Sequence, residues 1–208
     1  MWLLRVICGI TVEWHGLDRL PKGALIVAAK HQSMWETFAL ITLLADFAIV
    51  VKRELFFLPL FGWYMAKAQM IPLDRKGSVA AMRAFLRRAR VELERDRQIL
   101  IFPEGTRRAV GAPPAYKPGV AILYAATHAA CLPVAHNSGL VWPRRSFWRY
   151  PGVVRVEFLD PIPPGLKQDQ FFNRLKEDIE TATNRLMESA PAAAARADQN
   201  QPGARCHS

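Results

Sequence analysis

The chain has 208 residues, which is the usual length of one domain and long enough to bury a core without disulfides or metal. Its residues are 51% hydrophobic and 22% charged, a balance that excludes both a disordered chain and a protein with many membrane spans. Twenty-eight lysines and arginines against eighteen acidic residues give a formal net charge of +10, which favours phosphates, acidic lipid or nucleic acid as partners without choosing among them.

The first ten residues are apolar except for Arg5. A bilayer span needs about 20 apolar residues, and no small-residue cleavage site follows, so this segment is neither a full span nor a signal peptide. Two interpretations stay open. Residues 1–12 are either an amphiphilic N-terminal helix or strand, or the end of a longer membrane anchor.

Short apolar runs then alternate with helical patterns. The runs suit strands that are buried on both faces of a sheet, and they lie at residues 24–29, 48–51 and 98–102. Between the last two runs, apolar residues repeat every three or four positions after Ser78, which suits a helix N-cap. The run of three prolines and one isoleucine at residues 161–164 ends one more predicted strand, at residues 153–159.

The last helix is predicted from an apolar stripe over residues 171–186. Alternating strands and helices predict an α/β fold, in which a mixed, mostly parallel sheet is flanked by helices. We expect a single layered domain over residues 1–187. Residues 188–208 are rich in alanine and polar residues, and they are expected to form a disordered tail.

The first candidate site follows the first buried run, where residues 30–36 read KHQSMWE before an apolar helix predicted at about residues 34–44. On one continuous helix, residues five apart lie about 140° apart, so His31 and Glu36 can meet only if His31 lies in the loop before the helix. Glu36 then accepts a hydrogen bond from one imidazole nitrogen and leaves the other to take a proton from a hydroxyl. Alternatively, Ser33 and Glu36 form a capping box and His31 is an ordinary loop residue; both roles can coexist.

The second candidate site follows the buried run at residues 98–102, where the chain continues as PEGTRR. Gly105 permits a close backbone approach, Thr106 offers a hydroxyl, and Arg107 can hold a phosphate through two parallel charge-assisted hydrogen bonds. The alternative is a surface turn in which Glu104 pairs with an arginine.

Together the two stretches resemble the lysophosphatidic acid acyltransferase family, also called the 1-acylglycerol-3-phosphate acyltransferases, which carries H-x-x-x-x-D and F-P-E-G-T-R in this order. Here Glu36 replaces the usual Asp, and residues 102–107 match the second motif without a mismatch. Weaker similarities lie at residues 52–55 (KREL), 71–75 (IPLDR), 116–119 (YKPG) and 132–135 (LPVA).

The resemblance implies a glycerolphosphate acyltransferase-like fold and a specific reaction. A fatty acyl group passes from acyl-CoA or acyl-carrier protein to the free hydroxyl of 1-acylglycerol-3-phosphate, which gives phosphatidic acid in phospholipid biosynthesis. His31 is then the general base and Glu36 its orienter. The implied substrate-binding residues are Lys52, Asp74, Arg75, Glu104, Gly105, Thr106 and Arg107, with Lys52, Arg75 and Arg107 on the acceptor phosphate and Glu104 and Gly105 shaping the pocket.

Direct transfer without an acyl-enzyme is expected, because none of the matched motifs offers a serine or cysteine activated by its own base. No cofactor and no metal are expected either. Cys8, Cys131 and Cys206 form no C-x-x-C pair, a pattern that suits the cytosolic side of a membrane. The other histidines, His15, His128 and His136, have no acid at a useful spacing and are expected to be structural.

Two segments bear on membranes. Residues 55–66 are apolar but too short to span, are broken by Pro59 and Gly62, and could equally be core. Residues 142–150 mix aromatic rings with arginines, which suits a bilayer interface better than a surface loop. We therefore expect a peripheral or anchored protein on the cytoplasmic face of the inner (plasma) membrane.

The expected partners are membrane lipid, a lysophospholipid acceptor, and acyl-CoA or acyl carrier protein. Nucleic acid is not expected, because no recognisable nucleic-acid motif interleaves the basic residues with aromatics. One alternative is an acyltransferase that acts on another lyso-lipid. The alternative from a different class is a non-catalytic basic protein that binds anionic lipid.

Overall fold

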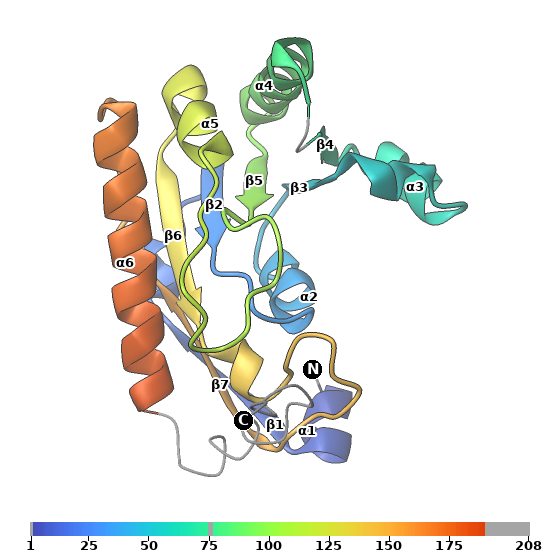
Figure 1. Cartoon of the computed structure of the whole chain (residues 1–208), viewed down its shortest axis with the longest axis vertical. Helices are drawn as coiled ribbons and strands as arrows, with labels where there is room; N and C mark the ends of the chain where they lie inside the picture. The colour runs from blue at the N-terminus through green and yellow to red at the C-terminus, as the bar shows by residue number, and fades with distance from the viewer. Residues whose placement is uncertain (1, 75–76, 190–208) are drawn as a thin grey trace, which may run out of the picture.

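The computed structural model describes residues 2–74 and 77–189. Its strands form one seven-stranded sheet in the order β1-β7-β6-β2-β5-β3-β4, with helices on both faces (Figure 1). The strands are β1 (Ile10–His15), β2 (Leu25–Ala29), β3 (Phe47–Lys52), β4 (Ile71–Leu73), β5 (Gln98–Ile101), β6 (Cys131–His136) and β7 (Gly152–Phe158). The α-helices are α1 (Trp2–Cys8), α2 (Trp35–Ile41), α3 (Phe61–Lys67), α4 (Val79–Glu94), α5 (Gly119–Thr127) and α6 (Gln168–Glu188), and the 3-10 helices are η1 (Leu17–Arg19), η2 (Arg53–Phe57) and η3 (Ser138–Leu140).

The sheet confirms the predicted α/β fold. Neighbouring strands run parallel except for β6 and β7, which are antiparallel, so the sheet is mixed and mostly parallel as expected. The buried runs at residues 24–29 and 98–102 contain β2 and β5, whose residues are all buried. The third run lies in β3, which is only partly buried because just the short strand β4 lies beyond it.

Side chains of successive residues in β2 point to opposite faces of the sheet and enter two separate cores. Leu25 and Val27 pack in a cluster with Trp35 and Leu40 of α2. Ile26 and Ala28 pack in the other cluster, with side chains of α4, α5 and α6. Burying an aliphatic or aromatic side chain contributes about 1.5–3 kcal/mol, and these two cores fix the strand ends on which the candidate site is built.

Several predicted boundaries can be compared with the structure. The hydroxyl of Ser78 accepts a hydrogen bond from the Ala81 amide at 3.4 Å, as expected of an N-cap. The helix predicted at residues 34–44 is shorter, and residues 2–8 form a helix, which is compatible with both N-terminal interpretations. Arg75 and, from residue 190 on, the predicted tail lie outside the described residues.

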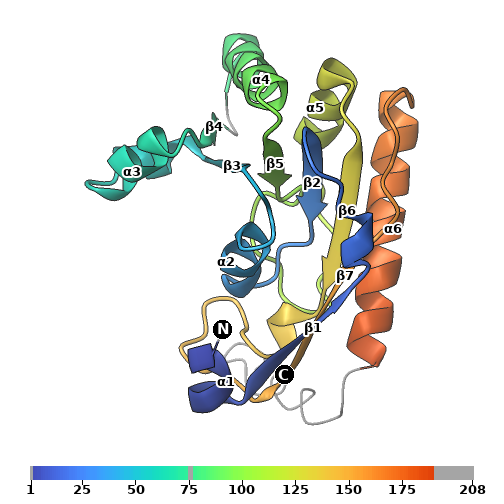
Figure 2. The same cartoon turned by 180° about the vertical axis from the view of Figure 1, so that it is seen from behind.

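Two short helices lie far apart at the ends of the sheet. Figure 2, seen from behind, shows α3 projecting from the end that carries β4, while α1 lies at the other end beside β1. Among the residues that the structure describes, no helix is both long and apolar enough to cross a bilayer.

Candidate active site

The two candidate motifs meet at one edge of the sheet. β2 and β5 are parallel neighbours, so their carboxyl ends lie side by side. His31 follows β2 in a loop, Glu36 lies in the first turn of α2, and Phe102 follows β5. The carboxyl edge of such a sheet is the usual place for a binding crevice, and the structure brings both motifs to it.

A hydrogen bond joins His31 to Glu36, with Nδ1 lying 2.9 Å from Oε1. Glu36 is completely buried. Its carboxylate also accepts hydrogen bonds from the amides of Gln32 (2.9 Å) and Ser33 (2.8 Å) and from the hydroxyl of Ser138 (2.9 Å). Because a carboxylate only accepts, Nδ1 of the neutral imidazole is the protonated nitrogen, and Nε2 is left to receive a proton.

The Glu36 carboxylate stays charged despite its burial. Burial acts to raise its pKa, but electrostatic interactions with His136 and His31 and the hydrogen bonds from His31 and the Ser33 amide outweigh it and hold the pKa below its ordinary value. A charged carboxylate that is hydrogen-bonded to an imidazole stabilises the protonated form of that imidazole.

Glu36 makes a contact with the His31 ring and a contact at the start of α2. The Ser33 hydroxyl accepts a hydrogen bond from the Trp35 amide at 3.1 Å, and Glu36 accepts one from the Ser33 amide. These contacts close the turn that begins α2, much as a capping box does. The same carboxylate therefore starts the helix and orients the His31 ring.

The second motif holds His31 in place from three directions. The Phe102 ring stacks on the imidazole, with ring centroids 4.1 Å apart. The Glu104 carboxylate accepts a hydrogen bond from the His31 amide at 3.2 Å, and the Arg108 amide donates one to the His31 carbonyl at 2.7 Å. The main chain and the ring of His31 are thus both fixed by residues that follow β5.

Glu104 lies in a buried charge network behind the site. It is 1% exposed, and its other oxygen lies 3.0 Å from Nζ of Lys30, which also contacts Glu180 of α6 at 2.6 Å. Burial raises the pKa of the Glu104 carboxyl even though Lys30 opposes the rise. We expected Glu104 to shape the pocket directly, but it is not among the described residues that line the cavity. It instead holds the main chain of His31.

Three supporting residues were missed by the sequence analysis. Ser138 and Glu180 bind the network from positions 102 and 150 residues away from their partners, a separation that no local pattern signals. Lys30 stands next to His31. It is buried, and its ammonium group contacts the carboxylates of Glu104 and Glu180. His136, expected to be structural, is fully buried and donates from Nε2 to the Lys30 carbonyl at 2.7 Å.

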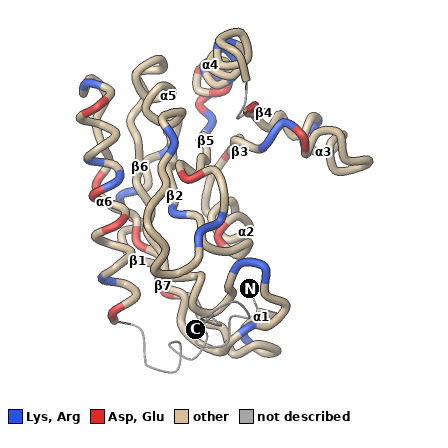
Figure 3. Tube along the Cα trace, in the orientation of Figure 1, with Lys and Arg blue, Asp and Glu red and all other residues tan. Residues whose placement is uncertain are grey.

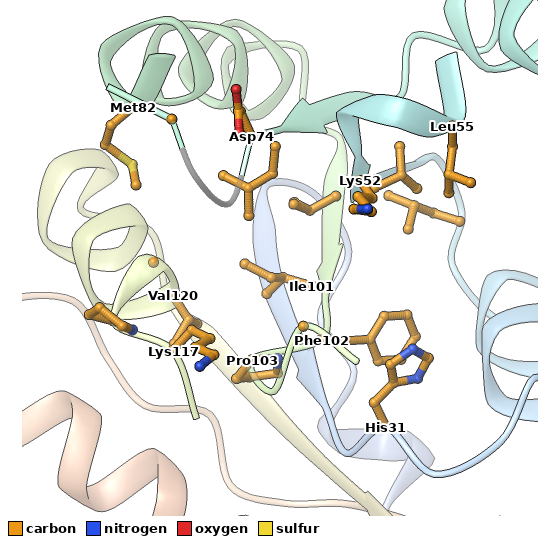
Figure 4. Close-up of a pocket in the computed structure, with 18 of the residues that line it drawn as sticks. His31, Lys52, Leu55, Asp74, Met82, Ile101, Phe102, Pro103, Lys117 and Val120 are labelled. Atoms are coloured by element: carbon orange, nitrogen blue, oxygen red, sulfur yellow. The ribbon is translucent and has the colours of Figure 1, made fainter. Parts of the chain in front are cut away.

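A cavity of about 460 Å³ opens beside His31 (Figure 4). Its walls are mainly apolar side chains of β3, β5 and the start of α5, including Ile49, Val51, Ile101 and Val120. Of the predicted binding residues, Lys52, Asp74 and Gly105 line it. Lys52 pairs with Glu54 at 3.0 Å, and Asp74 accepts from Arg53 at 3.5 Å.

Arg107 lies instead in an arginine cluster, which we define as Arg107, Arg108, Arg144 and Arg145. Partial burial lowers the pKa of Arg144, and the nearby charges of Arg145, Arg108 and Arg107 lower it further. Within residues 2–74 and 77–189, no acidic side chain forms an ion pair with any of the four. Figure 3 shows basic residues on the loop between η3 and β7, close to α1 and α2. This surface has a surplus of positive charge beside the His31 loop.

The chain matches a family of known proteins. The model of the family described as "Acyltransferase" matches residues 11–137, which is more than half of the chain. The chain belongs to this acyltransferase family. The matched segment includes His31, Glu36 and the whole motif that follows β5.

Similar proteins bear a common name. A 1-acyl-sn-glycerol-3-phosphate acyltransferase of Pseudomonas aeruginosa is 37% identical over 156 residues, which cover 75% of this chain and 61% of that protein. One from Limnanthes alba is 29% identical over 156 residues, which cover 74% of this chain and 55% of that protein. The chain therefore spans little more than half the length of these relatives.

A solved structure has the same fold. The crystal structure of the 1-acyl-sn-glycerophosphate acyltransferase from Thermotoga maritima matches with a TM-score of 0.71 and 26% identity, and the match covers 86% of this chain and 73% of that one. The similarity thus extends over most of the sheet and its helices, beyond the two motifs.

Proposed function

We propose that the chain is a 1-acylglycerol-3-phosphate O-acyltransferase, which moves a fatty acyl group from a thioester on CoA or acyl carrier protein to the free hydroxyl of the acceptor and yields phosphatidic acid. The observation that carries this proposal is the hydrogen bond from His31 Nδ1 to the buried Glu36 carboxylate. It leaves Nε2 as a base at the edge of an apolar cavity.

The reaction follows from this geometry. His31 Nε2 takes the proton of the acceptor hydroxyl while the oxygen attacks the thioester carbon, and Glu36 stabilises the imidazolium that forms. The C–S bond then breaks and the new acyl–oxygen ester remains. The leaving thiolate receives the proton from His31 and departs as a thiol. The chain itself is never acylated.

The cavity and the basic residues supply the two kinds of binding that this reaction needs. The apolar lining of the cavity suits a fatty acyl chain. Lys52, Arg75 and Arg107 are proposed to bind the acceptor phosphate, with Gly105 and Thr106 beside Arg107 and Asp74 at the wall of the cavity. The unpaired charge of the arginine cluster supports this assignment, since an uncompensated guanidinium is a strong ligand for phosphate.

Arg107→Lys tests the acceptor assignment. Arginine presents two parallel donors to a phosphate, whereas lysine offers a point charge, and losing a charge-assisted pair costs about 1.5–3 kcal/mol. The kcat/KM for 1-acylglycerol-3-phosphate is expected to fall roughly tenfold to a hundredfold. The matched control is an acceptor without a phosphate, on which the slow background rate should barely change. Equal losses on both acceptors would favour an enzyme for another lyso-lipid, or a structural role for Arg107.

We also propose that the chain docks on the cytoplasmic face of a membrane through α1 and the loop at residues 142–150. Trp2, Ile7, Phe147 and Trp148 are all more than two-thirds exposed. Trp142 and Arg149 of the same loop have a different position. The Arg149 guanidinium stacks 3.8 Å from the centre of the Trp142 ring and donates to carbonyls of the loop. They hold the loop together, and Phe147 and Trp148 form its outer surface.

The docking proposal predicts a loss of vesicle binding. Replacing Phe147 and Trp148 together with serine removes two rings that can lie at headgroup depth, so binding to vesicles with anionic lipid should weaken by about tenfold in a cosedimentation assay. Leu17→Ser, in η1, removes another exposed apolar side chain and should have no effect. Unchanged binding of the double variant would place the membrane contact elsewhere.

A further inference from the structure

The structure exposes a second apolar surface, at the opposite end of the sheet from α1. We name residues 53–67, which form η2 and α3, the projection, because they extend away from the sheet beside β4 (Figures 1 and 2). Residues 55–66 contain no charged residue. The large apolar side chains exposed by 49% to 84% are Phe57, Leu58, Leu60, Phe61, Trp63 and Tyr64.

The backbone of the projection holds these side chains outward. Gly62 packs so tightly that an added Cβ would lie 1.9 Å from the carbonyl oxygen of Phe56. Its amide donates to Leu58 at 2.8 Å, and Met65 anchors the inner side of α3 with 4% exposure. Leu60, the most exposed of the set, has φ of 62°, a conformation that costs a non-glycine residue energy. The exposed apolar tip is thus built by close packing beneath it.

An anionic bilayer fits this surface better than a second copy of the chain does. Trp63 and Tyr64 are residue types that concentrate at the membrane interface, and Lys67 extends its ammonium group over the Trp63 ring at 5.2 Å. A lysine placed in this way covers apolar surface with its stem and keeps its charge at headgroup depth. The net charge of +10 attracts an anionic surface and repels an identical chain.

The base of the projection belongs to the cavity beside His31. Lys52, directly before η2, and Leu55, within η2, both line the cavity (Figure 4). We propose that the projection inserts its apolar tip into the bilayer interface, so that this wall of the cavity lies against the membrane and lipid substrates pass directly between bilayer and site. The second half of this proposal rests on the proposed function; insertion itself does not.

The test is the paired variant Leu60→Ser with Trp63→Ser, neither of which lines the cavity. Binding of the purified protein to phosphatidylcholine vesicles with and without phosphatidylglycerol is measured by cosedimentation. We expect binding to the anionic vesicles to fall about tenfold or more. Transfer to an acceptor embedded in the vesicles should fall in step, while transfer to a short-chain lysophosphatidic acid dissolved as a monomer should stay at the wild-type rate.

Controls separate insertion from other effects. Leu17→Ser should match the wild type in every arm, and Lys67→Glu should weaken only the binding to anionic vesicles. If the paired variant unfolds, Leu60→Asn alone serves in its place. Unchanged vesicle binding overturns the proposal, and so does an equal loss on the soluble acceptor. Conversion of a wild-type dimer to a monomer with vesicle binding intact would assign the surface to a second copy. If the wild type transfers to no acceptor, the proposed function fails, whereas the vesicle arm still decides insertion.

Discussion

Replacing His31 with alanine is expected to abolish acyl transfer while the protein keeps its fold. His31 lies in a loop and is partly exposed, and its main-chain bonds to Glu104 and Arg108 do not depend on the imidazole. A positioned general base contributes about 10²- to 10⁴-fold to a rate, so kcat should fall by at least that range. The measurement is transfer from a thioester to 1-acylglycerol-3-phosphate, with the fold checked by circular dichroism.

Two companion variants sharpen this result. His15→Ala removes an exposed histidine at the end of β1, which runs opposite to β2 and so ends at the other edge of the sheet, and it should leave the rate unchanged. Glu36→Gln should lose most activity, because an amide cannot stabilise the imidazolium, whereas Glu36→Asp keeps the carboxylate and should keep some. Near-normal turnover by a folded His31→Ala variant would refute the mechanism, and a harmless Glu36→Gln would reduce Glu36 to a helix cap.

Lys30→Met is expected to have the largest effect on stability. Lys30 is 4% exposed and lies between the carboxylates of Glu104 and Glu180. Removing one partner of a buried ion pair leaves an uncompensated charge, at a cost of about 3–5 kcal/mol. The free energy of unfolding, measured by denaturant titration, should fall by that amount. Because Glu104 also holds the His31 amide, activity should fall with stability.

The pH dependence of this variant has a definite sign. Burial raises the pKa of Glu104 above its ordinary value of 4.5 in the presence of Lys30, and removing Lys30 raises it further. A group whose pKa is raised on folding stabilises the fold below its unfolded pKa and loses that contribution as the pH rises through the folded pKa. The loss in the free energy of unfolding of Lys30→Met relative to the wild type should therefore grow as the pH rises from about 4.5.

A matched double variant distinguishes charge from packing. Lys30→Met with Glu104→Leu removes both charges, so it should recover part of the stability that Lys30→Met loses. Glu180→Gln should cost less than Lys30→Met, because the Glu180 side chain is 20% exposed and Lys30 keeps its bond to Glu104. A loss below about 1 kcal/mol for Lys30→Met would mean that the network is not a structural support of the site.

The parts of the site that lie close in sequence were predictable. β2 and most of β5 are apolar, and polar residues follow each strand within three positions. Both the sheet edge and the pair of His31 and Glu36 could therefore be inferred. Ser138 and Glu180 could not, because the fold alone brings them to Glu36 and Lys30. The projection was equally open to a core interpretation, since an apolar run at residues 55–66 has the same composition whether its side chains face the core or the surface.

The most direct test of the account is the fate of the acyl group when the wild-type protein is mixed with a fatty acyl thioester and 1-acylglycerol-3-phosphate. Mass spectrometry of the lipids and of the intact protein, with free thiol measured alongside, follows every carrier of the group. We predict that phosphatidic acid and free thiol form in equal amounts, that the mass of the protein never increases, and that neither product forms with His31→Ala. No phosphatidic acid from the wild type, or a protein that gains the mass of the acyl group before the product appears, would contradict direct transfer by His31.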